Sequence, residues 1–209
     1  MARFPMFFNV EDRKCVVFGG GKVALRKIRT LVEFGARVVA VDSHCCPELV
    51  EMQEKGLIEI DRGFFMEDLY SSAFMIICAT DDEEFNREMV ETCKRKKIPV
   101  NSATDGEASD FLFRAVTKRG DIVVGVSTSG EAPALSAEIR SMVDELLPQW
   151  YEKISGSVEE IREEVFSKTD DEACRNEIMH RIVRSMIDNQ GDISPDEVNQ
   201  TIAKVIQSK

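Results

Sequence analysis

Long apolar runs are missing from this sequence, and so are the features of a secreted protein. No stretch of about eighteen apolar residues occurs, and the opening segment Met1-Ala-Arg-Phe-Pro5 is not followed by the hydrophobic core of a signal peptide. We therefore expect a soluble, cytoplasmic protein with no membrane partner.

Positive charge is also scarce. The 209 residues include 27 Lys and Arg against 38 Asp and Glu, a formal net charge of −11. Such a surface repels nucleic acid and anionic membranes, so a small molecule is the expected partner. An anionic small molecule would need a local basic patch, for which the candidates are Arg114, Lys118, Arg119 and Arg140.

The six cysteines lack the paired spacing of a zinc site. His44-Cys45-Cys46 is the one local cluster of soft ligands, but neighbours diverge in an extended chain and no second cluster completes a tetrahedral set. We predict reduced thiols, most of them buried, and no metal site.

Short apolar strands alternate with helical stretches over the first part of the chain, a pattern typical of a parallel sheet. The predicted strands cover 14–18, 37–41, 57–60, 74–80, 98–101 and 121–126, and the predicted helices cover 23–34, 47–55 and 83–97. After Gly130 the strands do not return: Pro133 opens an apolar helix, and three more helical stretches follow Trp150.

A glycine-rich turn separates the first strand from the first helix. Gly19-Gly-Gly-Lys-Val-Ala24 fits the G-x-G-x-x-G/A fingerprint of dinucleotide-binding proteins. Asp42 ends the second strand, where a carboxylate can accept both ribose hydroxyls. This order of strand, glycines, helix, strand and acid predicts an α/β fold with a Rossmann-type parallel sheet that binds NAD.

Methyltransferases that use S-adenosylmethionine share the glycine turn and the acid. Their sheets usually end in an antiparallel hairpin, whereas here the strand at 121–126 leads into Ser127-Thr-Ser-Gly130 and a helix, which favours an oxidoreductase. A second alternative is a sensor that binds a dinucleotide without turnover and signals through the helical tail.

Residues required by two common dehydrogenase chemistries are missing. Neither Tyr70 nor Tyr151 is followed four residues later by lysine, so the Tyr-x-x-x-Lys pair is absent. His44 lies near the adenosine end and His180 in the C-terminal helices, which leaves no histidine on the sheet for a hydroxy-acid dehydrogenase.

Several further motifs together resemble the precorrin-2 dehydrogenase and sirohydrochlorin ferrochelatase family, the N-terminal module of siroheme synthases. They are Phe4-Pro-Met-Phe7, Gly19-Gly-Gly-Lys-Val-Ala-Leu-Arg-Lys27, Ala79-Thr-Asp-Asp82 with Asn86, Ile98-Pro-Val-Asn101, and Ser127-Thr-Ser-Gly-Glu-Ala-Pro133.

The resemblance implies a Rossmann domain at 1–113, a dimerisation segment at 114–149, a small all-α domain at 150–209, and a homodimer. It implies NAD-dependent oxidation of precorrin-2 to sirohydrochlorin, followed in some members by insertion of ferrous iron. Dehydrogenation of another tetrapyrrole is the alternative within this chemistry.

The expected site residues fall into three groups. The cofactor is expected at Gly19, Gly21, Lys22, Val23, Asp42, Ser43, Thr80 and Asp81, and the substrate at Ser127, Thr128, Arg114 and Arg140. The resemblance implies an aspartate base after the fifth strand, but the commonly acidic position is Thr104 and the carboxylate is Asp105 next to it. Either a shift of one residue in the loop restores the geometry, which we favour, or the catalytic role is altered.

Overall fold

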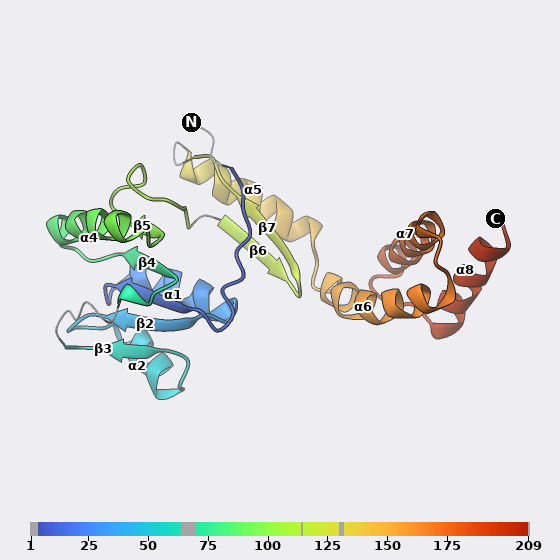
Figure 1. Ribbon diagram of the computed structural model, residues 1–209, viewed down its shortest axis with the longest axis horizontal. Helices are drawn as coiled ribbons and strands as arrows, with labels where there is room; N and C mark the ends of the chain where they lie inside the picture. Colours follow the sequence, from blue (N-terminus) through green and yellow to red (C-terminus); the bar gives the residue numbers. More distant parts are fainter. Residues whose placement is uncertain (1–3, 64–69, 114, 130–131, 209) are drawn as a thin grey trace. The chain divides into compact units, whose positions relative to one another are not determined.

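The computed structural model describes residues 4–63, 70–113, 115–129 and 132–208. The chain forms two compact units that divide after Phe113, and we call them the N-terminal and the C-terminal unit (Figure 1). The further division of the C-terminal unit at residue 149 stays a prediction. Among the described residues, no helix is both long and apolar enough to span a membrane.

A parallel sheet of five strands forms the centre of the N-terminal unit, in the order β3-β2-β1-β4-β5 (Figure 1). The strands are β1 (Lys14–Phe18), β2 (Arg37–Val41), β3 (Glu59–Asp61), β4 (Met75–Cys78) and β5 (Val100–Ser102). In the central strand, Val16 pairs with Val39 of β2 on one side and with Ile76 of β4 on the other. The strand order reverses at β1, the switch point where open α/β sheets bind ligands. The predicted Rossmann-type fold is confirmed.

Both faces of this sheet are covered, which explains why its strands are almost continuously apolar. Cys15 and Val17 of β1 pack in one core cluster with residues of α1 (Lys22–Glu33), such as Ile28. Val16 packs in a second cluster with residues of α4 (Glu83–Lys96), such as Met89. A short helix, α2 (Pro47–Glu54), joins β2 to β3.

The helix ends follow the signals in the sequence. Gly35 follows Phe34, the C-cap residue of α1, with φ +77°, the left-handed conformation in which glycine commonly ends a helix. Asp82 caps α4 by accepting the N–H of Phe85 at 2.9 Å. Acidic residues occupy the first turn of α4 and basic residues its last turn, as the helix dipole favours.

The strand predicted at 121–126 does not continue the parallel sheet. It is β7 (Ile122–Val126), which pairs antiparallel with β6 (Ala115–Arg119) in a separate two-stranded sheet. The sequence did not predict this hairpin, but the five-stranded sheet itself contains only parallel pairs, so the contrast with the methyltransferase sheet holds. Charged residues within Ala115–Arg119 hide the strand pattern, and Gly120, with φ +57°, closes the turn.

The rest of the C-terminal unit is helical. It contains α5 (Pro133–Leu146), α6 (Tyr151–Lys168), α7 (Glu172–Asp188) and α8 (Pro195–Gln207). Ile178, Ile182 and Met186 of α7 are fully buried between these last three helices, as their spacing predicts. At the start of α8, Ser194 accepts the N–H of Glu197, while the Glu197 carboxylate accepts the hydroxyl of Ser185 on α7.

Candidate functional site

The glycine turn after β1 is shaped by two close backbone approaches. Gly19 has φ +123°, and a Cβ there would lie 2.3 Å from the carbonyl oxygen of Ala79. At Gly20, a Cβ would lie 2.4 Å from the carbonyl oxygen of His44. These glycines bring the turn against the loops that follow β4 and β2, so neither position has room for a side chain.

Gly21 differs from its neighbours because the space where its Cβ would point is open, with nothing within 4 Å. As the N-cap of α1 it has no side chain to accept the first N–H groups of the helix, and no acidic residue occupies that first turn. Lys22 and Val23 begin the helix beside this opening, and both are exposed. A pyrophosphate fits this arrangement, since helix N-termini with free N–H groups bind phosphates.

Asp42 lies at the carboxyl end of β2, where the sequence predicts a ribose ligand. Its Oδ1 accepts the N–H of His44 at 2.9 Å, so the carboxylate is held by the turn that it closes. Within this turn, the Ser43 hydroxyl lies 2.8 Å from Nδ1 of His44. The backbone therefore fixes the Asp42 carboxylate at the same edge of the sheet as the glycine turn.

The turn that follows β4 is held by the buried side-chain amide of Asn86. Asn86 donates from Nδ2 to the carbonyl of Thr80 at 2.9 Å and accepts the Thr80 hydroxyl at 2.8 Å. The amide side chain is buried, whereas Asp81 is exposed at the same edge. Asn86 thus holds the Thr80 turn in place, a role that the sequence motif did not reveal.

A network of hydroxyl groups organises the loop after β5. Ser109 accepts the N–H of Ser102 at 2.8 Å and donates to the carbonyl of Asp105 at 2.7 Å. The Ser102 hydroxyl accepts the N–H of Asp105 at 3.2 Å and lies 3.1 Å from that of Thr104. Both serines are buried, so the backbone of Asp105 is tied to the core.

The two carboxylate oxygens of Asp105 differ in their surroundings. Oδ1 accepts the N–H groups of Glu107 at 3.0 Å and Ala108 at 2.9 Å. Oδ2 has no hydrogen-bond partner among the described residues, and the side chain is exposed. Asp105 therefore closes a turn with one oxygen and presents the other to solvent at the carboxyl edge of the sheet.

A buried lysine connects the glycine turn's helix to the same loop. Lys27 of α1 is 6% exposed, and its Nζ donates to Oδ1 of Asn101 at 2.7 Å and lies 4.9 Å from the centre of the Phe113 ring. Asn101 donates in turn to the carbonyl of Phe111 at 2.9 Å. Lys27 and Asn101 belong to motifs noted in the sequence. Only the fold shows that their hydrogen bonds connect the start of the Asp105 loop, at Asn101, with its end, at Phe111.

The cysteines do not form a reactive or metal-binding cluster in the described part of the chain. All six are free. Burial raises the pKa of Cys15 to about 11 and that of Cys78 to about 12, which keeps both thiols protonated near neutral pH. Burial also raises the pKa of Cys45. Among the described residues, no three His, Cys, Asp or Glu side chains gather as a metal site requires.

The residues expected to bind substrate belong to the C-terminal unit, and those that the structure describes form hydrogen bonds or an ion pair within it. Ser127 accepts the N–H of Ser129 at 3.2 Å, and Thr128 donates to the carbonyl of Ala132 at 2.9 Å. Arg140 pairs with Asp144 at 3.0 Å but stays 47% exposed. Arg114 lies outside the described residues.

The other two members of the expected basic patch differ in their contacts. The Arg119 guanidinium donates to the carbonyl of Leu147 and pairs with Asp144, so it joins the hairpin to α5. Lys118 of β6 pairs in register with Val123 of β7. The predicted patch is therefore partly used for packing within the unit.

A parallel sheet with an open glycine turn at its switch point, an acid after β2 and an uncapped helix N-terminus defines a dinucleotide-binding Rossmann protein. Comparison with known families agrees. Residues 6–115 match the family model described as "Putative NAD(P)-binding". The chain belongs to this NAD(P)-binding family.

Its relatives confirm the resemblance seen in the sequence motifs. The chain is 36% identical over 185 residues to the siroheme synthase of Thioalkalivibrio sulfidiphilus, a match that covers 88% of this chain and 38% of that protein. It is 31% identical over 184 residues to the siroheme synthase of Nitrosospira multiformis, covering 86% and 39%. The chain thus spans about two fifths of the length of these curated relatives.

Among solved structures, the fold matches "SirC, precorrin-2 dehydrogenase" with a TM-score of 0.77. The match covers 98% of this chain and 100% of that one, at 21% sequence identity. The two chains therefore share their fold over almost their whole length, the helical C-terminal region included.

Proposed function

We propose that this protein oxidises precorrin-2 to sirohydrochlorin with NAD as the acceptor, a step of siroheme biosynthesis. The observation that carries the proposal is the carboxylate of Asp105, which the loop network holds at the same sheet edge as the open glycine turn. The family, the siroheme synthase relatives and the shared fold support the same reaction.

The reaction requires little from the protein. Oxidation removes a hydride from a ring carbon and a proton from a ring N–H, so a positioned base is the main catalytic demand. When bound, NAD supplies the acceptor for the hydride. Gly21 and the N-terminus of α1 would hold its pyrophosphate and Asp42 its ribose. Oδ2 of Asp105 would take the proton, while the two N–H groups on Oδ1 keep the carboxylate oriented.

The decisive experiment is to incubate the purified chain with precorrin-2 and NAD and to follow absorbance. We expect sirohydrochlorin and NADH to form together in equal amounts. If the protein binds NAD but leaves precorrin-2 unchanged, the proposed reaction is wrong, and either the sensor or a dehydrogenase of another tetrapyrrole takes its place.

The cofactor preference is a first prediction. Asp42 would lie beside a 2′-phosphate and repel it, so NADP should bind at least roughly tenfold more weakly than NAD. Neither Ser43 nor His44 after Asp42 is an arginine, but the charge of Arg62 acts on Cys45 in the same turn and opposes the burial that raises the pKa of this thiol. We therefore expect Asp42→Asn to recover part of the NADP affinity. Calorimetric titration of both dinucleotides measures this, and equal or tighter NADP binding by the unmodified chain would show that Asp42 is not on the ribose.

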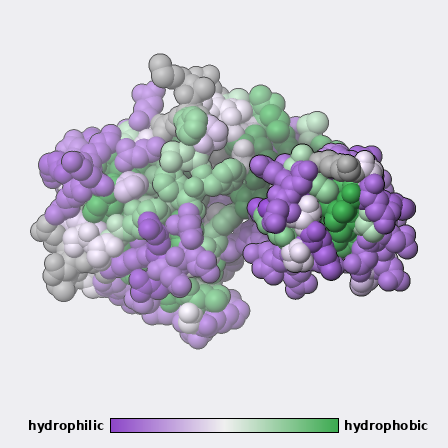
Figure 2. All heavy atoms as spheres, turned by 45° about the vertical axis from the view of Figure 1, so that its right-hand side comes forward, coloured by the Kyte–Doolittle hydropathy of each residue, from purple (hydrophilic) through white to green (hydrophobic). Residues whose placement is uncertain are grey.

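We also propose that the chain forms a homodimer through α5. The helix packs on the β6–β7 hairpin, yet Leu135, Met142 and Leu146 remain 53%, 56% and 73% exposed. They recur with helical spacing on one side of α5. Figure 2 shows that hydrophobic side chains (green) do reach the surface of the molecule. An apolar helix face without cover in the single chain is suited to self-association.

Charge on this face should therefore separate the subunits. The double substitution Met142→Glu and Leu146→Glu removes two apolar side chains from the interface, which should weaken dimerisation at least about a hundredfold. Light scattering coupled to size exclusion should then report half the mass. Leu57→Glu, at an exposed apolar position of the N-terminal unit, is the control and should leave the mass unchanged. A dimer that survives the double substitution would place the interface elsewhere.

A further inference from the structure

A groove of about 540 Å³ lies between α6 and α7. Its apolar lining consists of Val158, Phe166, Met179, Val183 and Ile187, and its polar lining consists of Arg162, Arg175, Asn176, His180 and Arg184. No carboxylate is among these lining residues, although the chain carries 38 acidic residues. The groove is therefore a local cationic and apolar site on an acidic protein.

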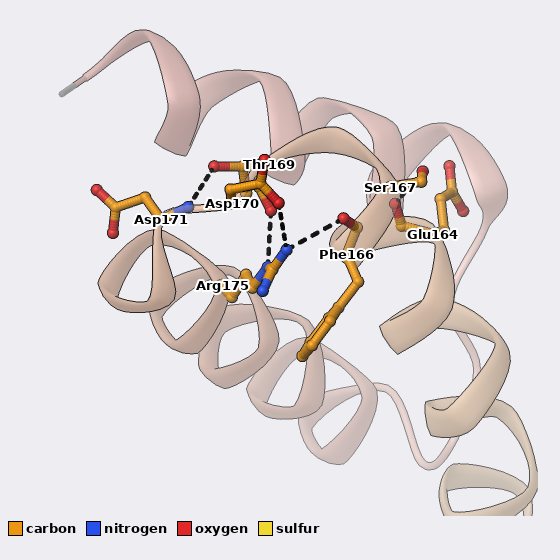
Figure 3. Close-up of polar contacts among 7 residues, drawn as sticks. All are labelled: Glu164, Phe166, Ser167, Thr169, Asp170, Asp171 and Arg175. Carbon is orange, nitrogen blue, oxygen red and sulfur yellow. Dashed lines mark hydrogen bonds and ion pairs between the residues drawn. The ribbon is translucent and has the colours of Figure 1, made fainter.

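One end of the groove is built around the Phe166 ring. The guanidinium of Arg175 lies 4.1 Å from the ring centre, and that of Arg162 lies 5.1 Å from it. Figure 3 shows Arg175 held by the turn between the helices, where it donates to the carbonyls of Thr169 at 2.7 Å and Phe166 at 3.3 Å. It also pairs with the exposed Asp170 at 3.0 Å. Arg175 thus fixes the turn, and its charge is partly compensated.

Arg162 is in a different position. Its side chain is exposed and, among the described residues, it contacts the Phe166 ring but pairs with no carboxylate. Its charge at the mouth of the groove is thus available to a ligand, and guanidinium groups bind carboxylates in a bidentate manner.

The opposite end of the groove carries a further cation, Arg184. Arg184 pairs with Asp188 at 3.4 Å, but both side chains are exposed and such pairs are weak. Arg175 and Arg184 are separated by about 14 Å along the helix axis, given the rise of an α-helix. A ligand with a single carboxylate can meet only one end, whereas a flat apolar ring with carboxylates around its rim can meet both.

We propose that this groove is a second binding site for a polycarboxylate tetrapyrrole, distinct from the site at the glycine turn. The volume fits a small-molecule site, and the lining, half apolar and half polar, offers both a surface for a ring and polar groups that fix its orientation. The choice of tetrapyrrole rests on the proposed function, since substrate and product of that reaction both belong to this class. A second site would retain the product near the enzyme before it passes to the next step.

The test is equilibrium dialysis of the full chain against a stable polycarboxylate porphyrin, counting bound molecules per chain. We expect two sites. Arg162→Glu reverses the uncompensated charge and should weaken one of them by at least roughly tenfold, because a charge-assisted contact is lost. Arg181→Glu is the matched control, since Arg181 is on α7, pairs with Glu177 and does not line the groove. It should bind like the unmodified chain.

Other outcomes separate the two proposals. If porphyrin binding is the same in the unmodified chain and in Arg162→Glu, with both folded by circular dichroism, the groove proposal is wrong. Equally tight, Arg162-dependent binding of dodecanoate would overturn the assignment to a tetrapyrrole. If the chain fails to oxidise precorrin-2 but keeps one Arg162-dependent porphyrin site, the proposed function fails and the groove proposal stands.

Discussion

Replacing Asp105 by alanine should lower the rate of precorrin-2 oxidation by on the order of a hundredfold to ten-thousandfold, the usual effect of losing a general base. Oδ2 of Asp105 is the carboxylate oxygen left open by the loop network, and Thr104 beside it cannot act as a base near neutral pH. NAD affinity should change little, because the glycine turn and Asp42 lie on other loops. Stopped-flow absorbance at saturating NAD and substrate measures the rate.

The alanine variant also removes the acceptor for two backbone N–H groups, so a second substitution is needed. Asp105→Asn keeps an oxygen in the Oδ1 position but cannot take a proton, and it should lose the same activity with an unchanged melting temperature. Asp110 provides a contrast, because its Oδ2 accepts the N–H of Val100 at 3.1 Å and has a structural role. Near-normal turnover in both Asp105 variants, together with loss of turnover in Asp110→Asn or Glu107→Gln, would place the base further along the loop.

The parallel sheet could be predicted because its signals are local. The strand Arg37–Val41 was predicted with its observed bounds, since a run of apolar residues follows a glycine-capped helix. Gly19 and Ala24 could be placed between the strand and the helix from the fingerprint alone, because that spacing is a local pattern of the chain. Such features depend on neighbours in the chain, and the sequence displays those neighbours directly.

Contacts between distant segments could not be predicted. The bond from Lys27 to Asn101 joins residues 74 positions apart, and nothing in either motif shows that the lysine is buried. Strand β6 was not predicted because its polar residues do not form an apolar strand pattern. Its extended conformation depends on pairing with β7. The groove between α6 and α7 depends on how two helices pack, so neither His180 nor Arg162 could be assigned to it from the sequence.

The glycine turn allows a test in which neighbouring positions give opposite results. Gly21→Ala adds a methyl group that meets nothing within 4 Å, at a residue with φ −88°, so the fold should remain intact. The same methyl group would occupy the space through which a pyrophosphate approaches the backbone, and NAD affinity should fall by at least about tenfold. Calorimetry with NAD and a thermal melt measure the two effects separately.

Gly20→Ala should instead lower the stability of the fold. Its methyl group would lie 2.4 Å from the backbone oxygen of His44, and that loop can give way only by moving the backbone that carries Asp42. Overpacking of this kind costs about 1–3 kcal/mol, so the melting temperature should fall in the absence of any ligand. The pair therefore separates binding from folding: loss of NAD affinity without loss of stability at Gly21 is expected only if the dinucleotide lies on this turn. If Gly21→Ala binds NAD normally while Gly20→Ala melts early, the glycines serve the fold alone and the cofactor must bind elsewhere.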